Sequence, residues 1–138
     1  MSANPIPQGQ YVPAVRHNGF IFTAGMTPRI NGKLMLSGKV KISEDVAQYR
    51  DAIRQASENA LTAAMNTLDE GECIQCLVSL TVFVNAEEGY TIHSRFADIA
   101  SEFFCENLGE KGKAVRASVG VASLPGNAPC EVQIIAAV

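Results

Sequence analysis

The sequence has no long apolar segment and no cluster of basic residues. Its 138 residues include 11 Lys and Arg against 14 Asp and Glu, giving a formal net charge of -3 at pH 7. Without a basic run, the electrostatic footprint of a nucleic-acid-binding protein is missing, which argues against RNA or DNA as a partner. The apolar stretches are interrupted before they reach membrane-spanning length, so no contact with a membrane is expected.

Cysteine is also scarce, and its positions are scattered. The four thiols are too few for a disulfide scaffold at this length, and they suit a reducing compartment as free side chains. Residues 1–5 lack a basic region followed by an apolar one, so no secretory signal is predicted and a cytoplasmic location is expected. Cys73 and Cys76 form a C-x-x-C pair, but no second pair or histidine follows at ligand spacing, so no metal site is predicted.

The composition that is present is that of a globular protein. Hydrophobic residues make up 47% of the chain and charged residues 18%, with no break that would mark a linker. A chain of this length is close to the commonest domain size. We therefore expect a single domain over residues 1–138.

Short strands and tight turns are predicted near the N-terminus. A strand is expected at Val12–Arg16 and another at Phe20–Thr23, joined through Asn18-Gly19, a typical hairpin turn. Asn31-Gly32 predicts a second turn before a weaker strand at Lys33–Ser37.

Two amphipathic helices follow from the spacing of apolar residues. The first is expected to begin at Ser43 as cap, to continue at three- and four-residue steps to Leu68, and to stop at Gly71. The second is predicted from Ile92 to about Leu108.

Three further strands complete the expected order ββ(β)αβαββ. Residues 74–84 are apolar and β-branched on both faces, as in a central strand, and residues 115–122 and 130–138 close the chain. This order predicts an α+β sandwich, a mixed sheet with two helices on one face.

Arg116 and Glu131 are the candidate functional residues, because each is a charge in an otherwise apolar strand. A buried guanidinium is costly unless an anion or hydrogen-bond partners meet it, and its fork suits bidentate carboxylate binding. The alternative for each residue is structural: Arg116 reaches water or a neighbouring acid, and Glu131 forms an ion pair. If the last two strands pair with each other, Arg116 and Glu131 could lie close together, although spacing does not fix the register.

Two motifs resemble the RidA/YjgF family (reactive intermediate deaminase, endoribonuclease L-PSP-like). At the C-terminus these are Ala114-Val115-Arg116-Ala117, Leu124-Pro125 and Glu131, which are similar to the family's C-terminal signature. At the N-terminus, Gly9-Gln10-Tyr11 and Ala24-Gly25-Met26-Thr27-Pro28 are similar to the family's Gly-x-Tyr and Ser-Gly-Gln-x-Pro segments. The match extends over nearly the whole chain.

The resemblance implies a chorismate-mutase-like fold of the bacillus type, assembled as a homotrimer with a cleft at each subunit interface. In family members of the deaminase type, the residue that corresponds to Arg116 binds the carboxylate of a 2-imino or enamino acid. The residue at Glu131 positions the attacking water, and the products are a 2-keto acid and ammonia, with no cofactor required. By the same resemblance Tyr11 lines the cleft, and Gly25 and Ser118 offer backbone groups to the ligand.

The chain departs from the deaminase pattern at three positions. Ala24 stands where the family has Ser, Met26 replaces Gln, and Ala97 stands near a position where deaminases commonly carry Asn. The lost hydroxyl and amide leave a second hypothesis open, in which the cleft binds small keto or carboxylic acids without turnover.

Overall fold

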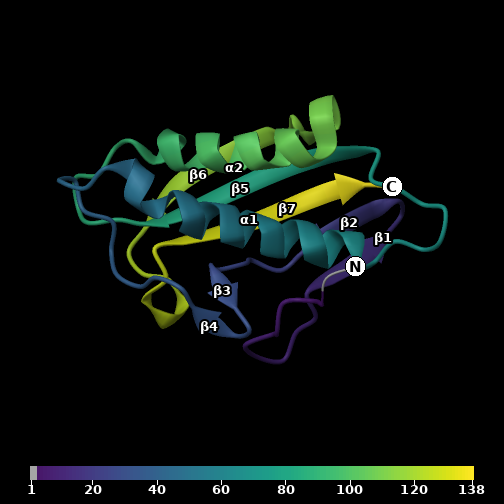
Figure 1. The fold of residues 1–138 in the computed structure, drawn as a ribbon, viewed down its shortest axis with the longest axis horizontal. Coiled ribbons are helices and arrows are strands. Elements are labelled where there is room, and N and C mark those ends of the chain that lie inside the picture. Colours follow the sequence, from purple (N-terminus) through teal and green to yellow (C-terminus); the bar gives the residue numbers. More distant parts are fainter. Residues whose placement is uncertain (1–2) are drawn as a thin grey trace.

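A five-stranded sheet forms the centre of the computed structural model, which describes residues 3–138, and two helices cover one of its faces (Figure 1). In their order across the sheet, the strands are β1 (Ala14–His17), β2 (Phe20–Thr23), β7 (Cys130–Ala137), β5 (Cys76–Asn85) and β6 (Val115–Val121). All neighbours are antiparallel except β5 and β6, which run parallel. The predicted mixed sheet of an α+β fold is confirmed.

The helices are α1 (Arg50–Met65), preceded by the short helix η1 (Val46–Tyr49), and α2 (His93–Leu108). Two further short helices are η2 (Gly109–Gly112) and η3 (Pro125–Asn127). Within residues 3–138, no helix combines the length and the apolar character needed to cross a membrane.

The core lies between the sheet and the two helices. Its largest members are fully buried side chains from both layers: Ile53, Leu80, Phe96, Phe104 and Ile134. Each apolar side chain of this size contributes about 1.5–3 kcal/mol when it is removed from water. This burial fixes the helices against the sheet, in which Arg116 lies on β6 and Glu131 on β7.

Both predicted Asn-Gly turns are confirmed. Asn18 and Gly19 have φ values of 50° and 80°, and Asn31 and Gly32 have 52° and 81°. Two consecutive positive φ values are what a tight two-residue hairpin turn requires, and Asn and Gly tolerate them best. The second turn joins a separate small hairpin, β3 (Arg29–Ile30) and β4 (Lys33–Leu34), which is shorter than predicted.

The first helix begins and ends inside its predicted bounds. Asp45, not Ser43, caps the short helix η1 that leads into α1, because its side chain accepts a hydrogen bond from the backbone N–H of Ala47. Helix α1 itself begins at Arg50 without a side-chain cap. Regular α-helix stops at Met65, and the chain then turns before Gly71, which has a φ of 85°.

The last two strands do not pair with each other, so the condition under which Arg116 and Glu131 could lie close together is not met. Strand β5 lies between β6 and β7 and pairs with both along most of its length. The segment from 122 to 129, which contains η3, is long enough to cross the roughly 10 Å between strands that are two positions apart in a sheet.

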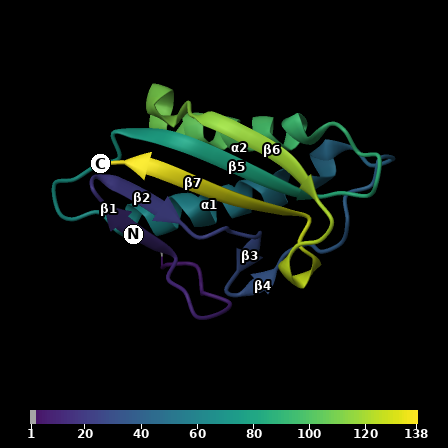
Figure 2. The ribbon, with the colours of Figure 1, turned by 180° about the vertical axis from the view of Figure 1, so that it is seen from behind.

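The face of the sheet opposite the helices is not covered by any other element of the described chain (Figure 2). The strand register places five exposed apolar side chains on this face, namely Val15, Phe20, Phe22, Val115 and Val119. Val115 is 73% exposed. An apolar surface of this kind is typical of a protein–protein contact.

Candidate functional site

Arg116 is held against α2 on the helix-covered side of the sheet. It lies opposite the buried Leu80 of β5, and its Nη2 contacts Asp98 Oδ1 at 2.7 Å while its Nη1 donates to Ser101 Oγ at 3.0 Å. The salt bridge to a neighbouring acid, one of the alternatives weighed above, is therefore present in this chain. Because a guanidinium carries five N–H donors, others remain for an external carboxylate, and the head is already oriented.

The two partners of Arg116 were not found from the sequence. Asp98 and Ser101 are three residues apart on α2, so they lie on one side of the helix. Which side of α2 meets β6 depends on how the helix docks on the sheet, and spacing along the chain does not reveal it.

Ser118 shares this surface with Arg116. It is two residues further along β6, and so on the same face, and its Oγ donates to the backbone O of His93 at 2.8 Å. We call Arg116 and Ser118, with their α2 partners, the Arg116 half-site.

Glu131 lies on the uncovered face of the sheet, beside Gly25. It pairs with Phe83 of β5, and its carboxyl group is half-buried. Burial raises the pKa of the Glu131 carboxyl above its usual value, because desolvation penalises the charged form. A Cβ on residue 25 would overlap this carboxyl group, so glycine is required for the close approach.

Backbone hydrogen bonds hold the segment of Gly25 beside β7. Met26 N donates to Val132 O at 2.7 Å, and Val132 N donates to Met26 O at 2.8 Å. From the other side, Asn59 on α1 donates to the backbone O of Thr27 at 3.1 Å. The position of Gly25 against Glu131 is therefore fixed by both the sheet and α1.

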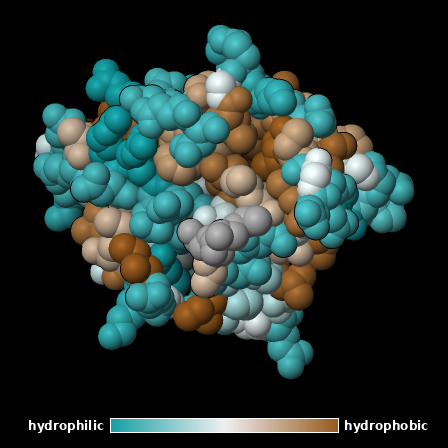
Figure 3. All heavy atoms as spheres, turned by 45° about the vertical axis from the view of Figure 1, so that its right-hand side comes forward, coloured by the Kyte–Doolittle hydropathy of each residue, from teal (hydrophilic) through white to brown (hydrophobic). Residues whose placement is uncertain are grey.

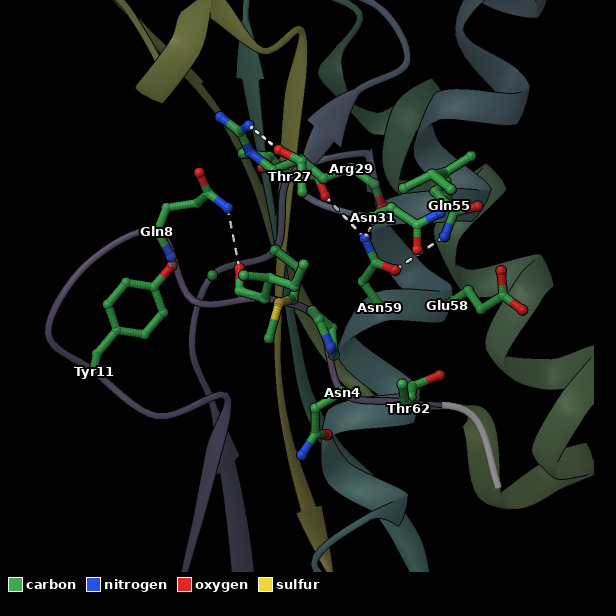
Figure 4. A pocket seen from close by; sticks show the side chains of 17 residues that line it. Asn4, Gln8, Tyr11, Thr27, Arg29, Asn31, Gln55, Glu58, Asn59 and Thr62 are labelled. Atoms are coloured by element: carbon green, nitrogen blue, oxygen red, sulfur yellow. Dashed lines mark hydrogen bonds between the residues drawn. The ribbon is translucent and has the colours of Figure 1, made fainter.

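Tyr11 and Gly25 line a cavity of about 440 Å³ between the N-terminal segment, the β2–β3 connection and α1 (Figure 4). Tyr11 Oη accepts a hydrogen bond of 2.9 Å from the backbone N–H of Gln8, which holds the ring at one side of the cavity. Asn59 and Gln55 form the opposite wall, joined by a 2.9 Å hydrogen bond. Because Gly25 contacts both the cavity and the carboxyl group, we call Tyr11, Gly25 and Glu131 the Glu131 half-site.

The two half-sites do not meet within one chain. Arg116 pairs with Leu80 and Glu131 pairs with Phe83, and these two β5 residues are three apart, so they face opposite sides of the sheet. Arg116 and Glu131 therefore do not lie close together within a chain: β5 separates them laterally, and the sheet itself separates their side chains.

Two of the three departures from the deaminase pattern are buried, and the third is partly buried. Met26 is 6% exposed, Ala97 is fully buried, and Ala24 packs against the core. None of the three supplies a polar side chain to either half-site.

The whole chain, residues 1–138, matches the model of the family described as endoribonuclease L-PSP. The chain belongs to this family. The resemblance recognised from the two sequence motifs is thereby confirmed, together with the fold that it implied.

Similar proteins support this L-PSP family membership. The chain is 30% identical to the protein Atu1372 of Agrobacterium tumefaciens, whose function is unknown, with a TM-score of 0.83 over 96% of this chain and 85% of that one. It is 25% identical to a candidate endoribonuclease of Shewanella oneidensis, with a TM-score of 0.89 over 99% and 91% of the two chains. Protein TCP17 of Trypanosoma cruzi is 27% identical over 136 residues, which are 98% of this chain and 85% of that protein.

A second cavity of this L-PSP family chain lies away from both half-sites. It has a volume of about 270 Å³ and lies between the C-terminal ends of α1 and α2, with Met65, Leu68, Ile74 and Leu108 among its lining residues. Figure 3 shows apolar surface among polar side chains on this side of the molecule. Cys73 of the C-x-x-C pair lines this cavity, whereas Tyr11, Gly25, Arg116, Ser118 and Glu131 are not among its lining residues.

Proposed function

We propose that the protein assembles as a homotrimer and binds a small carboxylate-bearing metabolite in clefts between subunits. In this proposal it hydrolyses reactive 2-imino or enamino acids to 2-keto acids and ammonia. The observation that carries the proposal is the division of the expected site into two halves on opposite faces of one chain. A site that needs both halves is completed when the Arg116 half-site of one subunit meets the Glu131 half-site of the next.

The uncovered sheet face supports an assembly of this kind. Its exposed aromatic and β-branched residues include Phe22 and Val119, which lie at the two sides of the sheet. Burying such a surface against other copies is favourable by about 25 cal/mol for each Å² of apolar area. Members of the L-PSP family are small-molecule-binding homo-oligomers, which agrees with this use of the face.

The chemistry assigns a role to each charged residue. Arg116 holds the substrate carboxylate through its free N–H donors, and Asp98 and Ser101 keep its head in place. Glu131 takes a proton from water as the oxygen attacks the C2 carbon of the imine, and the proton passes to nitrogen. The new hydroxyl group then gives its proton to nitrogen as the C–N bond breaks, which leaves the keto group and releases ammonia.

The environment of Glu131 suits this role. A general base works best when its pKa lies near the working pH, and burial raises the pKa of this carboxyl in that direction. Tyr11 is the wall of the cleft on the same side, and the backbone groups of Gly25 and Ser118 complete the binding of the ligand.

Binding without turnover is the second candidate function. It is favoured by Ala24 and Met26, because the hydroxyl and amide of the deaminase pattern are replaced by apolar side chains packed toward the core. In that case Arg116 and Glu131 hold a keto or carboxylic acid that is not consumed.

Cleavage of RNA, which the family description suggests, is not favoured. The chain has only two histidines, and they lie at opposite ends of the sheet. His17 lies near the C-terminal end of β7, because it pairs with Phe20, which in turn pairs with Ala137. His93 lies against Gly120 of β6, which is near the other end of β7, since Gly120 and Cys130 both pair with Val84. No histidine pair is therefore available for proton transfer at one phosphate.

Mixing two inactive variants tests the proposed site. Arg116→Ala and Glu131→Gln are each expected to abolish ammonia release from an imine made by an amino-acid oxidase. When the two are unfolded together and refolded at equal amounts, about a quarter of the interfaces pair an intact Arg116 with an intact Glu131, so about a quarter of the activity returns.

Three outcomes decide between the functions. Recovery of activity on mixing supports deamination at a shared cleft. If wild type shows no turnover but keto acids raise its melting temperature, and not that of Arg116→Ala, binding without turnover is correct. If neither variant changes turnover or binding, the cleft model is wrong.

A further inference from the structure

The imidazole ring of His93, a residue of α2, lies against β6 on the same face of the strand as Arg116. His93 is the first residue of α2, and its ring lies over Gly120. A Cβ on residue 120 would lie only 2.5 Å from His93 Nε2, so glycine at this position leaves the space that the ring occupies. On its other side the ring meets Tyr90 edge-on, with 5.3 Å between ring centroids.

The His93 ring is fixed in position but has no hydrogen-bond partner. Among residues 3–138, neither of its nitrogens makes a hydrogen bond, although its backbone O accepts from Ser118. The other histidine of the chain differs, because His17 Nε2 lies 3.1 Å from Asn18 Nδ2. A half-buried imidazole held by packing on two sides, with its nitrogens unused, is available to a ligand.

Strand geometry aligns His93 with the Arg116 half-site. Arg116, Ser118 and Gly120 alternate along β6, so they face the same side of the sheet. The four residue steps from Arg116 to Gly120 span about 13 Å of strand, and the five steps from His93 to Asp98 span about 7.5 Å of helix. The imidazole and the guanidinium therefore lie roughly 8–13 Å apart along one surface.

The surface around His93, at the Gly120 end of the line formed by Arg116, Ser118 and Gly120, favours a negatively charged ligand group. Helix α2 starts there without a side-chain cap, and its first turn holds no acidic residue. The backbone N–H groups at the start of a helix carry partial positive charge. The acid nearest to Arg116 along α2, Asp98, is already paired with it.

We infer that the substrate of the proposed site is a 2-imino dicarboxylic acid, whose second carboxylate binds His93. This inference rests on the proposed function, in which Arg116 holds the carboxylate next to the reacting carbon. A diacid of about five carbons spans the gap with a hydrogen bond of about 3 Å at each end. The imine of an acidic amino acid has this chemistry.

Two keto acids of equal length test the inference in the full-length protein. They are 2-oxoglutarate, which has the second carboxylate, and 2-oxopentanoate, which ends in a methyl group. Calorimetry of wild type is expected to show that the diacid binds about tenfold more tightly or better. His93→Ala should remove this preference, and His93→Gln, which keeps a donor, should restore part of it.

The imidazole signals in NMR spectra provide a second test, because adding the diacid would not shift the His93 signal if His93 had only a structural role. The chain has two histidines, so the signals are assigned with His17→Ala, which also serves as the control variant. The diacid should shift the His93 signal and the monoacid should shift it less, while the His17 signal stays in place for both.

The outcomes separate this inference from the proposed function. If both acids bind equally to wild type and to His93→Ala, and Arg116→Ala abolishes binding, the inference is overturned and the carboxylate site stands. If neither acid binds, or if binding is indifferent to Arg116→Ala, the proposed function fails and the inference fails with it.

Discussion

The carboxyl group of Glu131 fills the space into which a side chain at residue 25 would project. Gly25 belongs to the segment hydrogen-bonded to β7, so the segment is not free to move aside. The position of the candidate base therefore depends on the absence of a single methyl group at residue 25, in the connection between β2 and β3.

Gly25→Ala is expected to abolish function while the fold is retained. The new methyl group must displace the Glu131 carboxyl, and a displacement of about 1 Å at a catalytic group costs on the order of a hundredfold in rate. Ammonia release from a generated imine measures the effect, with circular dichroism to confirm folding. Gly9→Ala is the control, because a Cβ there makes only an ordinary 3.5 Å contact with Tyr11. Full activity in Gly25→Ala would show that Glu131 is not the base.

Arg116→Lys is expected to weaken carboxylate binding by about tenfold to a hundredfold, because lysine keeps the charge but loses the bidentate fork. The stability of the fold should change by less than about 1 kcal/mol, since the pair with Asp98 is largely exposed. Calorimetry with a keto acid and urea unfolding measure the two quantities. Arg50→Lys, which alters a similar exposed pair with Glu102 on the helix layer, should leave binding unchanged. Equal weakening in both variants would contradict a specific clamp.

Two carboxyl groups should affect stability in opposite directions as the pH changes. Burial raises the folded-state pKa of Glu131, so the folded chain holds this proton more tightly than the unfolded chain does. Stability from this group is therefore present below the unfolded pKa of about 4.5 and is lost as the pH rises through the folded pKa. Glu131→Gln should be more stable than wild type at neutral pH, and the difference should vanish in acid.

Glu72 is the matched control for that experiment. Its hydrogen bonds to Arg16 lower the pKa of its carboxyl, so its contribution is present above the unfolded pKa and is lost as the pH falls through the folded pKa. Glu72→Gln should be less stable than wild type at neutral pH, with the difference closing in acid. Urea unfolding across a pH series measures both variants, and differences of the same sign would refute the assignment.

The four thiols should react in an order set by burial. Cys73 is exposed and is expected to react first with a thiol reagent, followed by the half-buried Cys76 and Cys105. Cys130 is fully buried, and burial raises the pKa of its thiol to about 12, so it should react only when the chain opens. Mass spectrometry of labelled peptides gives the order. A keto acid that binds beside Glu131 should slow labelling of Cys130, and no change on ligand addition would place binding elsewhere.

Local elements were predictable because their signals are local. The turn at Asn18-Gly19 requires two positive φ values, and the residues that tolerate them are visible in the sequence. The apolar spacing that predicted α2 is the spacing of the side chains, such as Phe96 and Ala100, that are buried under the helix. The first helix was predicted too long because Ser43 and Asp45 both suit a cap, and only hydrogen bonding decides between them.

The arrangement of the site was not predictable from the same signals. Nothing in the spacing of β6 and β7 shows that β5 is inserted between them, because strand order depends on which long-range pairings bury the most apolar surface. The ion pair between Asp98 and Arg116 depends in turn on which side of α2 packs against β6. The sequence marked Arg116 and Glu131 as unusual residues, but it did not reveal that they lie on opposite faces of the sheet.

The place of β5 between the two half-sites has a consequence for how activity would scale with the amount of protein. A chain whose own halves face away from each other gains a working cleft only by meeting another copy. Activity per chain would then fall on dilution below the concentration at which copies separate, and would recover on concentration. Under the proposed function, the expression level of the protein would itself set the fraction of chains able to act.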